Sequence, residues 1–437
     1  MTSIKLYSNN VEKKSILVGK KNNTNQSETS LGSKRVVSSD PIEALILNLI
    51  STSQKADASS IHIYSNNKSY GCFFEISSKL QPTGKNFNNN ILEELLDFIK
   101  TSSNLEKSDL NPVQTASLSI DSQKLNLTYI QNIEDGNSHL IINLSSNSSH
   151  KTLEDSGFWG KSLEDLEEVL DYRKGIILID SKDSYNLRVL INSCLNYLKQ
   201  QNNIASVSFD SSYMNLPEVK NHDRIFTKVS SLTKKFIEQV ITSNPRVVCL
   251  VDVLTKDTLE IAHELSVSGK LVVIAMSEGS VAGSLKRVIN LIPEDVKNEF
   301  LLELKTVASI SPIQTIASSN GNHQLDNSII SQLENFFGLE LPESWKIIYS
   351  HAGIKSPEEL LHLELPVVSE YGGVTNLVEV LKLNDYLKRT FARNTNLSAE
   401  TLNRLALQSG MMSKREDGLI KALRKEVDLS DVIDICK

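Results

Sequence analysis

The chain has 437 residues, of which 40% are hydrophobic and 23% are charged, and its formal net charge is −7 at pH 7. This length allows two or three domains, because single hydrophobic cores stop growing near ~250–300 residues. The acidic balance, without a lysine- or arginine-rich block, argues against nucleic acid as a partner, and no apolar run approaches the ~18–20 residues of a membrane-spanning helix.

The N-terminal residues do not have the apolar core of a secretory signal peptide, so we expect a cytoplasmic protein that meets a membrane only through partners. The four cysteines are scattered through the sequence and lie mostly in apolar contexts. This pattern predicts buried free thiols in a reducing compartment, and no C-x-x-C pair typical of a metal site is present.

The first part of the chain predicts a flexible segment followed by a small α+β domain. Residues 1–39 are rich in serine, asparagine and lysine. Asp40 and Pro41 then have the chemistry of a helix N-cap and a first helical position. Strands are predicted at residues 61–63 and 71–76, a helix at 90–101, and further strands at 116–120, 125–133 and 138–143. We therefore place this domain at residues 40–144 and a serine- and asparagine-rich linker at 145–152.

Residues 174–195, KGIILIDSKDSYNLRVLINSCL, contain the central pattern of the chain. The unbroken apolar run at 176–179 predicts a buried strand, residues 180–186 a loop, and the apolar spacing over 187–195 a helix. Nucleotide-binding proteins place phosphates at such a helix start, since its N–H groups and its dipole favour anions. This loop has no glycine and carries Asp183, so on its own the segment is typical of an ordinary strand-to-helix turn.

The remaining segments alternate between strands and helices, which predicts an α/β domain over residues 153–437. The helix before the central strand is predicted to begin with a capping box formed by Ser162 and Asp165. Further strands are predicted at 204–209, 247–251 and 271–275, and helices at 232–242, 257–268 and 282–288. From about residue 293 we expect a helical C-terminal subdomain, with one apolar stripe made of Leu301, Leu304, Val307 and Ile310.

The order of these segments resembles the secretion and pilus assembly ATPases, the hexameric motors of type II secretion and type IV pili. The agreement is collinear over residues 40–435 and includes ASSIHI at 58–63, in which Ser60 takes the place of the family's aspartate, GM at 410–411 and EDG at 416–418. The resemblance implies a PAS-like N-terminal α+β domain and a RecA-like, P-loop-type ATPase domain with a helical C-terminal region. Further matching scaffold positions are Pro245, Thr258, Glu260, Ile261, Ala262, Gly269, Leu271, Val272 and Lys421.

The resemblance also implies where a motor of this family would bind nucleotide, and the residues there differ. The family's loop, GPTGSGKTTT, aligns without a gap and places its lysine on Leu187 and the following threonine on Arg188. A loop without glycine and without that lysine does not have the groups that wrap a triphosphate. The candidate nucleotide-binding positions are the degenerate Walker A residues Ser181, Lys182, Asp183, Ser184, Tyr185, Asn186, Leu187 and Arg188.

Other functional positions of the family are also replaced. Asp252 stands at the Walker B glutamate, where a motor would orient its attacking water, but it is one methylene shorter, and a strand-end residue that caps a nearby loop is the simpler interpretation. Asp210 is displaced by two positions from the family's acidic pair, so no metal role is assigned to it. At the other replaced positions, Glu75 and Asn126 stand where the family has arginines, and Ser208 and Ser212 where it has glutamates. Lys270 and Ser277 stand where it has histidines, and Val251 and Leu254, beside Asp252, are also replaced.

We therefore predict a catalytically degenerate pseudo-ATPase of this family, with no bound metal and no cofactor. No cysteine lies between Cys249 and Cys436, where the family often carries a zinc-binding loop, so that zinc site is excluded. The expected partners are an active paralogous ATPase, in a homo- or hetero-hexamer, and the inner-membrane platform protein of a pilus or secretion machine, at the inner face of the plasma membrane.

Two alternatives stay open. The chain could be a divergent ATPase that binds ATP and Mg²⁺ through a replaced loop, using Asp252 with Lys182 or Arg188. It could also be a free-standing binding module that reuses the fold for another small ligand. No other active site is indicated, because the eight histidines show no metal-ligand spacing and no G-x-S-x-G motif occurs.

Overall fold

A computed structural model of the chain describes residues 41–56, 58–66, 69–76, 79–83, 89–103, 105, 113–120, 123–131, 137–144, 152–201, 204–211, 219, 222–226, 244–324, 364–394 and 397–436. The described residues all belong to one compact unit, which spans Asp40–Lys437. The flexible segment expected at 1–39, most of the linker at 145–152 and the helix expected at 232–242 lie outside the described residues. No helix in the described ranges is both long and apolar enough to cross a bilayer.

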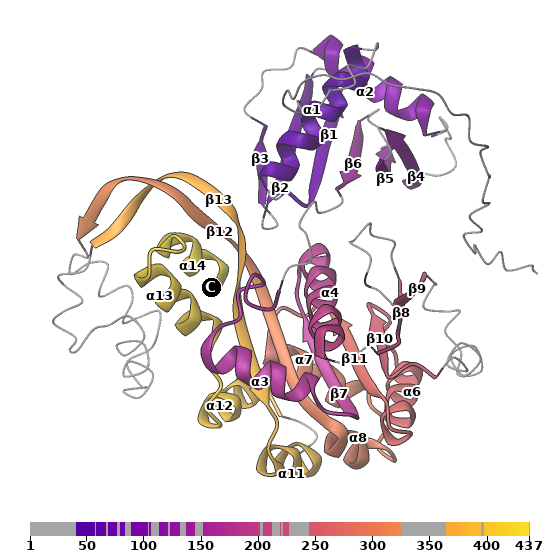
Figure 1. The fold of residues 1–437 in the computed structure, drawn as a ribbon, viewed down its shortest axis with the longest axis vertical. Helices are drawn as coiled ribbons and strands as arrows, with labels where there is room; N and C mark the ends of the chain where they lie inside the picture. The colour runs from indigo at the N-terminus through magenta and orange to yellow at the C-terminus, as the bar shows by residue number, and fades with distance from the viewer. Residues whose placement is uncertain are drawn as a thin grey trace, which may run out of the picture. The chain divides into compact units, whose positions relative to one another are not determined.

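The first sheet is antiparallel and is formed by residues 60–143 (Figure 1). Its described strands lie in the order β3-β2-β1-β6-β5-β4. They are β1 (Ser60–Asn66), β2 (Ser69–Ile76), β3 (Lys79–Pro82), β4 (Val113–Ile120), β5 (Gln123–Gln131) and β6 (Ser138–Asn143). The helices α1 (Pro41–Lys55) and α2 (Asn89–Ser102) pack their apolar sides on one face of this sheet. α1 begins at Pro41, as predicted, and the N-cap expected at Asp40 lies outside the described residues.

Alternation along β1 decides which side chains face the two helices. Ile61 and Ile63 are fully buried in the core that α1 and α2 complete. Successive side chains of a strand point to opposite faces of a sheet. Ser60, His62 and Tyr64 therefore lie on the face opposite the helices.

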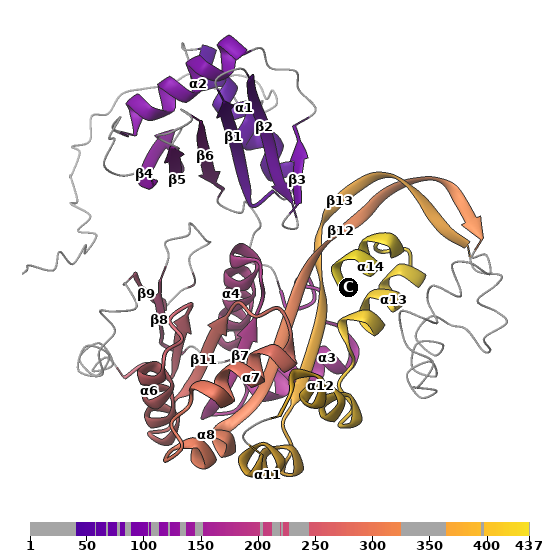
Figure 2. The same cartoon turned by 180° about the vertical axis from the view of Figure 1, so that it is seen from behind.

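The second sheet is mostly parallel and has helices on both faces (Figures 1 and 2). Its described strands lie in the order β13-β12-β7-β11-β10-β8-β9, and β12 pairs parallel with β7 but antiparallel with β13. The strands are β7 (Gly175–Asp180), β8 (Ser206–Asp210), β9 (His222–Phe226), β10 (Val247–Val251), β11 (Leu271–Met276), β12 (Leu304–Gln324) and β13 (Glu364–Lys382). The described helices are α3 (Gly160–Leu170), α4 (Ser184–Gln201), α6 (Lys256–Val267), α7 (Val281–Leu291), α8 (Lys297–Glu303), α11 (Asp385–Arg393), α12 (Ala399–Gln408), α13 (Lys414–Leu423) and α14 (Leu429–Cys436).

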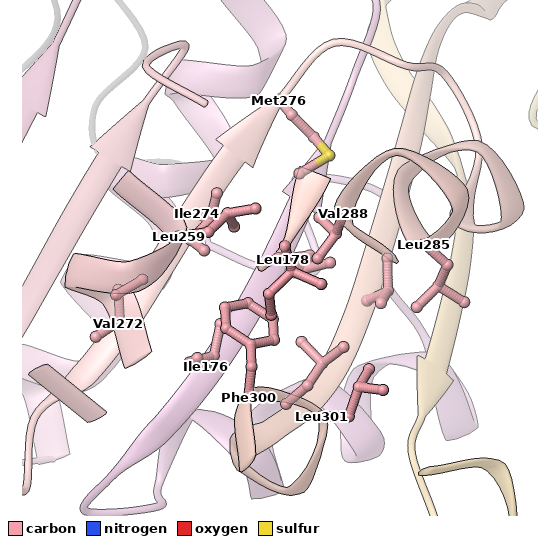
Figure 3. Close-up of a cluster of buried hydrophobic side chains, with 14 of the residues drawn as sticks. Ile176, Leu178, Leu259, Val272, Ile274, Met276, Leu285, Val288, Phe300 and Leu301 are labelled. Carbon is pink, nitrogen blue, oxygen red and sulfur yellow. The ribbon is translucent and has the colours of Figure 1, made fainter. Parts of the chain in front are cut away.

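The core of this domain is divided between the two faces of the sheet. Ile176 and Leu178 of β7 point to the side of α6, α7 and α8, where they join Leu259 in one cluster (Figure 3). Ile177 and Ile179 join the cluster on the opposite face, which α3 and α4 complete. A strand buried on both faces has a continuous apolar sequence, which is the pattern that predicted β7. The carboxyl end of β7 is therefore held from both sides.

The helical stripe expected at Leu301, Leu304, Val307 and Ile310 is wrong beyond its first residue. α8 ends at Glu303, and β12 begins at Leu304 and pairs with both β7 and β13. Residues 306–310 are all buried, so this stretch of β12 lacks the alternation of a half-exposed strand. The helical C-terminal region begins instead with α11.

The capping box expected from Ser162 and Asp165 is also wrong. α3 begins at Gly160 with Trp159 at its N-cap, so Ser162 is the third helical residue. Its hydroxyl accepts the backbone N–H of Trp159 at 3.3 Å and donates to the Trp159 carbonyl at 2.8 Å. Serine can serve at either end of a capping box, and the pattern alone therefore placed the helix start too late.

The C-terminal segment that matches the family most specifically has a structural role. Asp417 is fully buried and accepts hydrogen bonds from the indole N–H of Trp159 at 2.6 Å and from Lys421 Nζ at 2.8 Å. Gly418 lies so close to α14 that an added Cβ would stand 2.4 Å from Val432 Cγ1. These residues hold α13 against α3 and α14, as expected for packing positions.

Candidate functional site

The candidate site lies where β7 ends and α4 begins. β7 is buried throughout, and α4 follows it after only three residues. The seven-residue loop expected at 180–186 is therefore wrong, because the exposed Ser184, the half-buried Tyr185 and the buried Asn186 already form the first turn of the helix. So short a connection leaves little backbone to curl round a triphosphate.

Asp183 occupies the place at the start of α4 that an anion would take. Its Oδ1 accepts the backbone N–H of Asn186 at 2.7 Å and the side-chain amide of the same residue at 3.1 Å. Its own N–H donates to Ser181 Oγ at 3.2 Å, and both residues are buried. A carboxylate is favourable at a helix N-terminus because it satisfies free N–H groups and faces the positive end of the dipole. A phosphate bound there would meet this negative charge.

Leu187 of α4 and Lys182 of the loop are two further candidate nucleotide-binding positions. Leu187, at the position of the family's lysine, is fully buried in the core beside Leu190. An apolar side chain in the core cannot replace the point charge that a phosphate-binding lysine supplies. Lys182 is exposed, and its aliphatic carbons lie against Gly279, where φ is 88° and an added Cβ would stand 2.4 Å from the lysine.

Arg188, at the position of the family's threonine, is the centre of a buried ion-pair cluster. Its side chain is 2% exposed. Nε donates to Asp210 Oδ2 at 2.9 Å, and one terminal nitrogen donates to Asp210 Oδ1 at 2.6 Å and to Asp252 Oδ2 at 2.9 Å. The other terminal nitrogen donates to the Ser184 carbonyl at 3.0 Å. Burial alone would lower the pKa of Arg188, but the hydrogen bonds and charges of the two aspartates raise it.

The two aspartates come from neighbouring parallel strands. Asp210 ends β8, and Asp252 follows β10, in which Val251 is the strand partner of Asp210. Asp252 has a φ of 52°, in the left-handed region that residues other than glycine rarely adopt. Its Oδ1 also accepts the hydroxyl of Ser277 at 3.1 Å. The contact with Ser277 agrees with the interpretation of Asp252 as a residue that ties strand ends and loops together.

The sequence indicates only part of this cluster. Asp252 and Arg188 stand out as replaced positions, but Asp210 has no predicted role because it is displaced from the family's acidic pattern. The signal that joins the three is the adjacency of β8 and β10 in the sheet. The carboxyl ends of two parallel neighbours lie at the same edge, so acidic residues that end them come together.

The carboxylates that could hold a divalent metal ion are already used by this cluster. Both oxygens of Asp210 accept hydrogen bonds from Arg188, and those of Asp252 accept from Arg188 and Ser277. Mg²⁺ needs oxygen ligands at ~2.0–2.1 Å in a nearly octahedral arrangement. The residues do not fit such an ion while the guanidinium group lies between the two carboxylates.

A second buried polar network fixes the end of β7. Asp180 Oδ1 accepts the backbone N–H groups of Glu278 at 2.6 Å and Gly279 at 3.0 Å, and its Oδ2 accepts the hydroxyl of Ser309 at 2.6 Å. Lys414 Nζ donates to Ser309 Oγ at 2.7 Å and to the Gly279 carbonyl at 2.9 Å, and burial lowers its pKa. The loop before α7, which borders the site, is thus tied to β7, β12 and α13.

The other replaced positions are engaged in local contacts. Glu75 Oε2 lies 3.2 Å from His62 Nε2, and Ser208 Oγ lies 3.1 Å from His222 Nε2. Lys270 donates to the side chain of Asn244 in the turn before β10. Val251 is buried in the cluster that α3 and α4 complete, and Leu254 packs against the cluster on the opposite face of the sheet. Ser212 lies outside the described residues, and the side chain of Asn126 is not among those described.

Comparisons with known proteins agree with this architecture. A family model described as "Type II/IV secretion system protein" matches residues 35–434. A curated relative, the type II secretion system protein E of Xanthomonas campestris pv. campestris, is 22% identical over 282 residues, which are 64% of this chain and 46% of the relative. The match therefore spans just under half the length of that relative.

Several solved structures share the fold. The ATPase DotB of Legionella pneumophila has a TM-score of 0.60 at 10% identity, covering 89% of this chain and 94% of that one. DotB of Yersinia pseudotuberculosis has a TM-score of 0.60 at 10% identity, with 90% and 92% covered. The pilus retraction motor PilT, solved with bound ADP, has a TM-score of 0.55 at 13% identity, with 89% and 96% covered. The predicted fold class, an N-terminal domain followed by a RecA-like domain, is confirmed.

Proposed function

Because this chain belongs to the type II/IV secretion system protein family, we propose that it is a member that does not hydrolyse ATP and that acts as a structural or regulatory subunit of a pilus or secretion machine. The observation that supports this most directly is the ion-pair cluster in which Arg188 lies between Asp210 and Asp252. The proposal places the protein in the cytoplasm at the inner face of the plasma membrane. Its partners there are an active paralogous ATPase and the membrane platform protein, in a hexamer.

The charges of the site disfavour the binding of a triphosphate. A motor of the P-loop class holds the β- and γ-phosphates with a lysine and a Mg²⁺ ion. In this chain the cation, Arg188, points to two aspartates, and the helix start is occupied by Asp183. Removing one partner from a buried ion pair costs about 3–5 kcal/mol. A nucleotide that drew Arg188 away from its aspartates would have to offset a cost of that order before any net binding.

Specific buried contacts hold together the framework around the candidate site. Asp417 joins α13 to Trp159, and Asp180 joins β7 to the loop before α7. A subunit that fills a place in a ring needs this framework but needs no hydrolysis. That combination favours a structural or regulatory role over a motor role.

The test is equilibrium binding of Mg²⁺·ATP to the purified full-length chain by titration calorimetry, followed by a phosphate-release assay. We expect no saturable micromolar binding and no turnover above buffer. A family member with an intact G-x-x-x-x-G-K-[S/T] loop, measured under the same conditions, is the positive control. Saturable binding with turnover by this chain would overturn the proposal.

A divergent ATPase is the second candidate function. Asp252 stands at the Walker B position, and Arg188 brings a cation to the first turn of α4, which favours this candidate. It predicts turnover that is lost in Asp252→Ala and retained in Asp257→Ala, a change at an exposed residue in the first turn of α6. A free-standing binding module, the third possibility, predicts that the chain does not co-purify with a paralogue that carries an intact loop.

A further inference from the structure

A cluster of rings and a carboxylate lies on the face of the first sheet opposite α1 and α2. It joins the neighbouring strands β2, β1 and β6. His62 Nδ1 faces His139 Nε2 at 2.9 Å, and His62 Nε2 lies 2.8 Å from Ser60 Oγ and 3.2 Å from Glu75 Oε2. The ring of Tyr64 stacks on His139, with the ring centroids 3.9 Å apart. The ion-pair cluster around Arg188 in the second sheet does not involve these residues.

The hydrogen bonds of the cluster limit how many protons it can hold. Ser60 Oγ donates to Glu75 Oε2 at 2.5 Å, which uses its one hydrogen. His62 Nε2 then faces two acceptor oxygens and must carry a hydrogen itself. One further hydrogen lies between His62 Nδ1 and His139 Nε2. If both imidazoles were charged, two N–H donors would face each other across 2.9 Å, and neither could accept.

We propose that the His62 and His139 pair is a proton-operated clamp between β1 and β6, closed while one hydrogen lies between the facing nitrogens and released when each nitrogen carries its own. The bond crosses the strand pair diagonally, since His62 is opposite Ile141 and His139 is opposite Tyr64. β1 also holds β2 through a full antiparallel register. Release therefore loosens the centre of the sheet rather than its edge.

The electrostatics of the cluster agree with a clamp that acid opens. Burial, and then the charge of His62, lower the pKa of His139 to about 4 from its usual 6.5. The other titratable groups that face the pair among the described residues are Glu75 from β2, whose pKa is lowered mainly by its hydrogen bond to His62, and Tyr64 from β1, whose pKa is raised by burial. On the far side of His139, β5 presents Ile130, which does not titrate.

The sign of the effect follows from linkage. A histidine whose pKa is lower in the folded state binds fewer protons there than in the unfolded state between pH 6.5 and about 4. Its contribution to stability is complete above 6.5 and is lost as the pH falls through that window. Glu75, whose pKa is lowered from 4.5, contributes only at the acid end, so the two groups act in separate ranges.

The test is hydrogen exchange of the full-length chain, followed by mass spectrometry and corrected for the intrinsic rate at each pH. In β1 and β6 of the wild type, we expect the opening constant to rise by up to about tenfold for each pH unit below 6.5. His139→Gln keeps a polar side chain that cannot take up a proton, so its exchange should not depend on pH in that range. Peptides from β10 and β11 serve as the internal reference.

A wild type whose β1 and β6 protection is independent of pH, or a His139→Gln variant that loses protection as the wild type does, would overturn the clamp. Should the variant fail to fold, titration of the wild type with histidine-selective isotope labelling decides the matter. The clamp requires that the pKa of His139 lies well below the usual 6.5. Independent titration of His139 at its ordinary value would contradict it.

Discussion

Asp210 accepts two hydrogen bonds from Arg188, from Nε at 2.9 Å and from a terminal nitrogen at 2.6 Å. The side chain of Asp210 is 9% exposed and that of Arg188 is 2% exposed. Bidentate pairs of this kind are among the strongest hydrogen-bonded contacts in proteins. Under the proposed function, the same contact fills the place where a motor of this family would hold a metal ion and a phosphate. We therefore expect both the stability of the fold and the exclusion of nucleotide to depend on this guanidinium group.

Replacing Arg188 with methionine should lower the free energy of unfolding by about 3–5 kcal/mol, because two aspartates are left without their buried cation. Urea denaturation followed by tryptophan fluorescence measures this change, since Trp159 lies in the C-terminal domain. Arg287→Met is the matched control. Its ion pair with Glu278 is largely exposed, and such pairs contribute about 0–1 kcal/mol. Equal effects of the two variants would contradict the assignment of a buried pair.

Replacing Asp183 with alanine removes the cap of α4 and should destabilise the protein by about 0.5–2 kcal/mol. Asp183→Asn keeps a side-chain acceptor for the Asn186 N–H and should retain most of that stability. Neither variant should bind Mg²⁺·ATP in a calorimetric titration, because Leu187 stays in the core. Saturable binding by Asp183→Ala would mean that this carboxylate alone keeps nucleotide out.

Replacing Gly418 with alanine should destabilise the C-terminal region by about 1–3 kcal/mol, because the added methyl group would stand 2.4 Å from Val432 Cγ1. The double variant Gly418→Ala/Val432→Ala should lose less than the sum of the two single changes, since trimming valine makes room for the methyl group. Urea denaturation of the four proteins provides the cycle. Strict additivity would show that the two residues are not in contact.

We expect His222 to make the stability of the C-terminal domain depend on pH. Burial, and then the charge of Arg224, lower its pKa from 6.5 to about 4. The folded state therefore binds fewer protons in that window, and stability should fall as the pH drops from 6.5 towards 4. The midpoint of urea denaturation, followed by tryptophan fluorescence, should vary less with pH in His222→Gln than in the wild type. A variant that keeps the full dependence would assign it to other groups.

Much of the fold could be predicted because its signals are local. β7, β10 and β11 are buried on both faces, and such strands have unbroken apolar runs. α1 begins at Pro41, and α6 is followed by Gly269 with a φ of 93°, as proline and glycine chemistry predict. The first part of β12 was missed because residues 306–310 are all buried, which removes the alternation by which a strand is recognised.

The features of the candidate site that depend on single residues could be predicted from the sequence. Those that depend on the order of strands in the sheet could not. The absent glycines and Leu187 can be read from the sequence itself. Arg188 is 22 positions from Asp210 and 64 from Asp252, and their meeting depends on the order of β8 and β10. No local pattern encodes that order. The sequence therefore shows Arg188 only as the replacement of a family threonine, whereas the structure shows that it also pairs with two aspartates.

The place of β12 beside β7 has a consequence for any shortened form of the protein. β7 receives hydrogen bonds from β11 on one side and from β12 on the other. A chain that stopped after α8 would leave the second side of this apolar strand open, and exposed strand edges of that kind pair with other molecules and aggregate. We therefore expect β12 to protect the central strand from self-association.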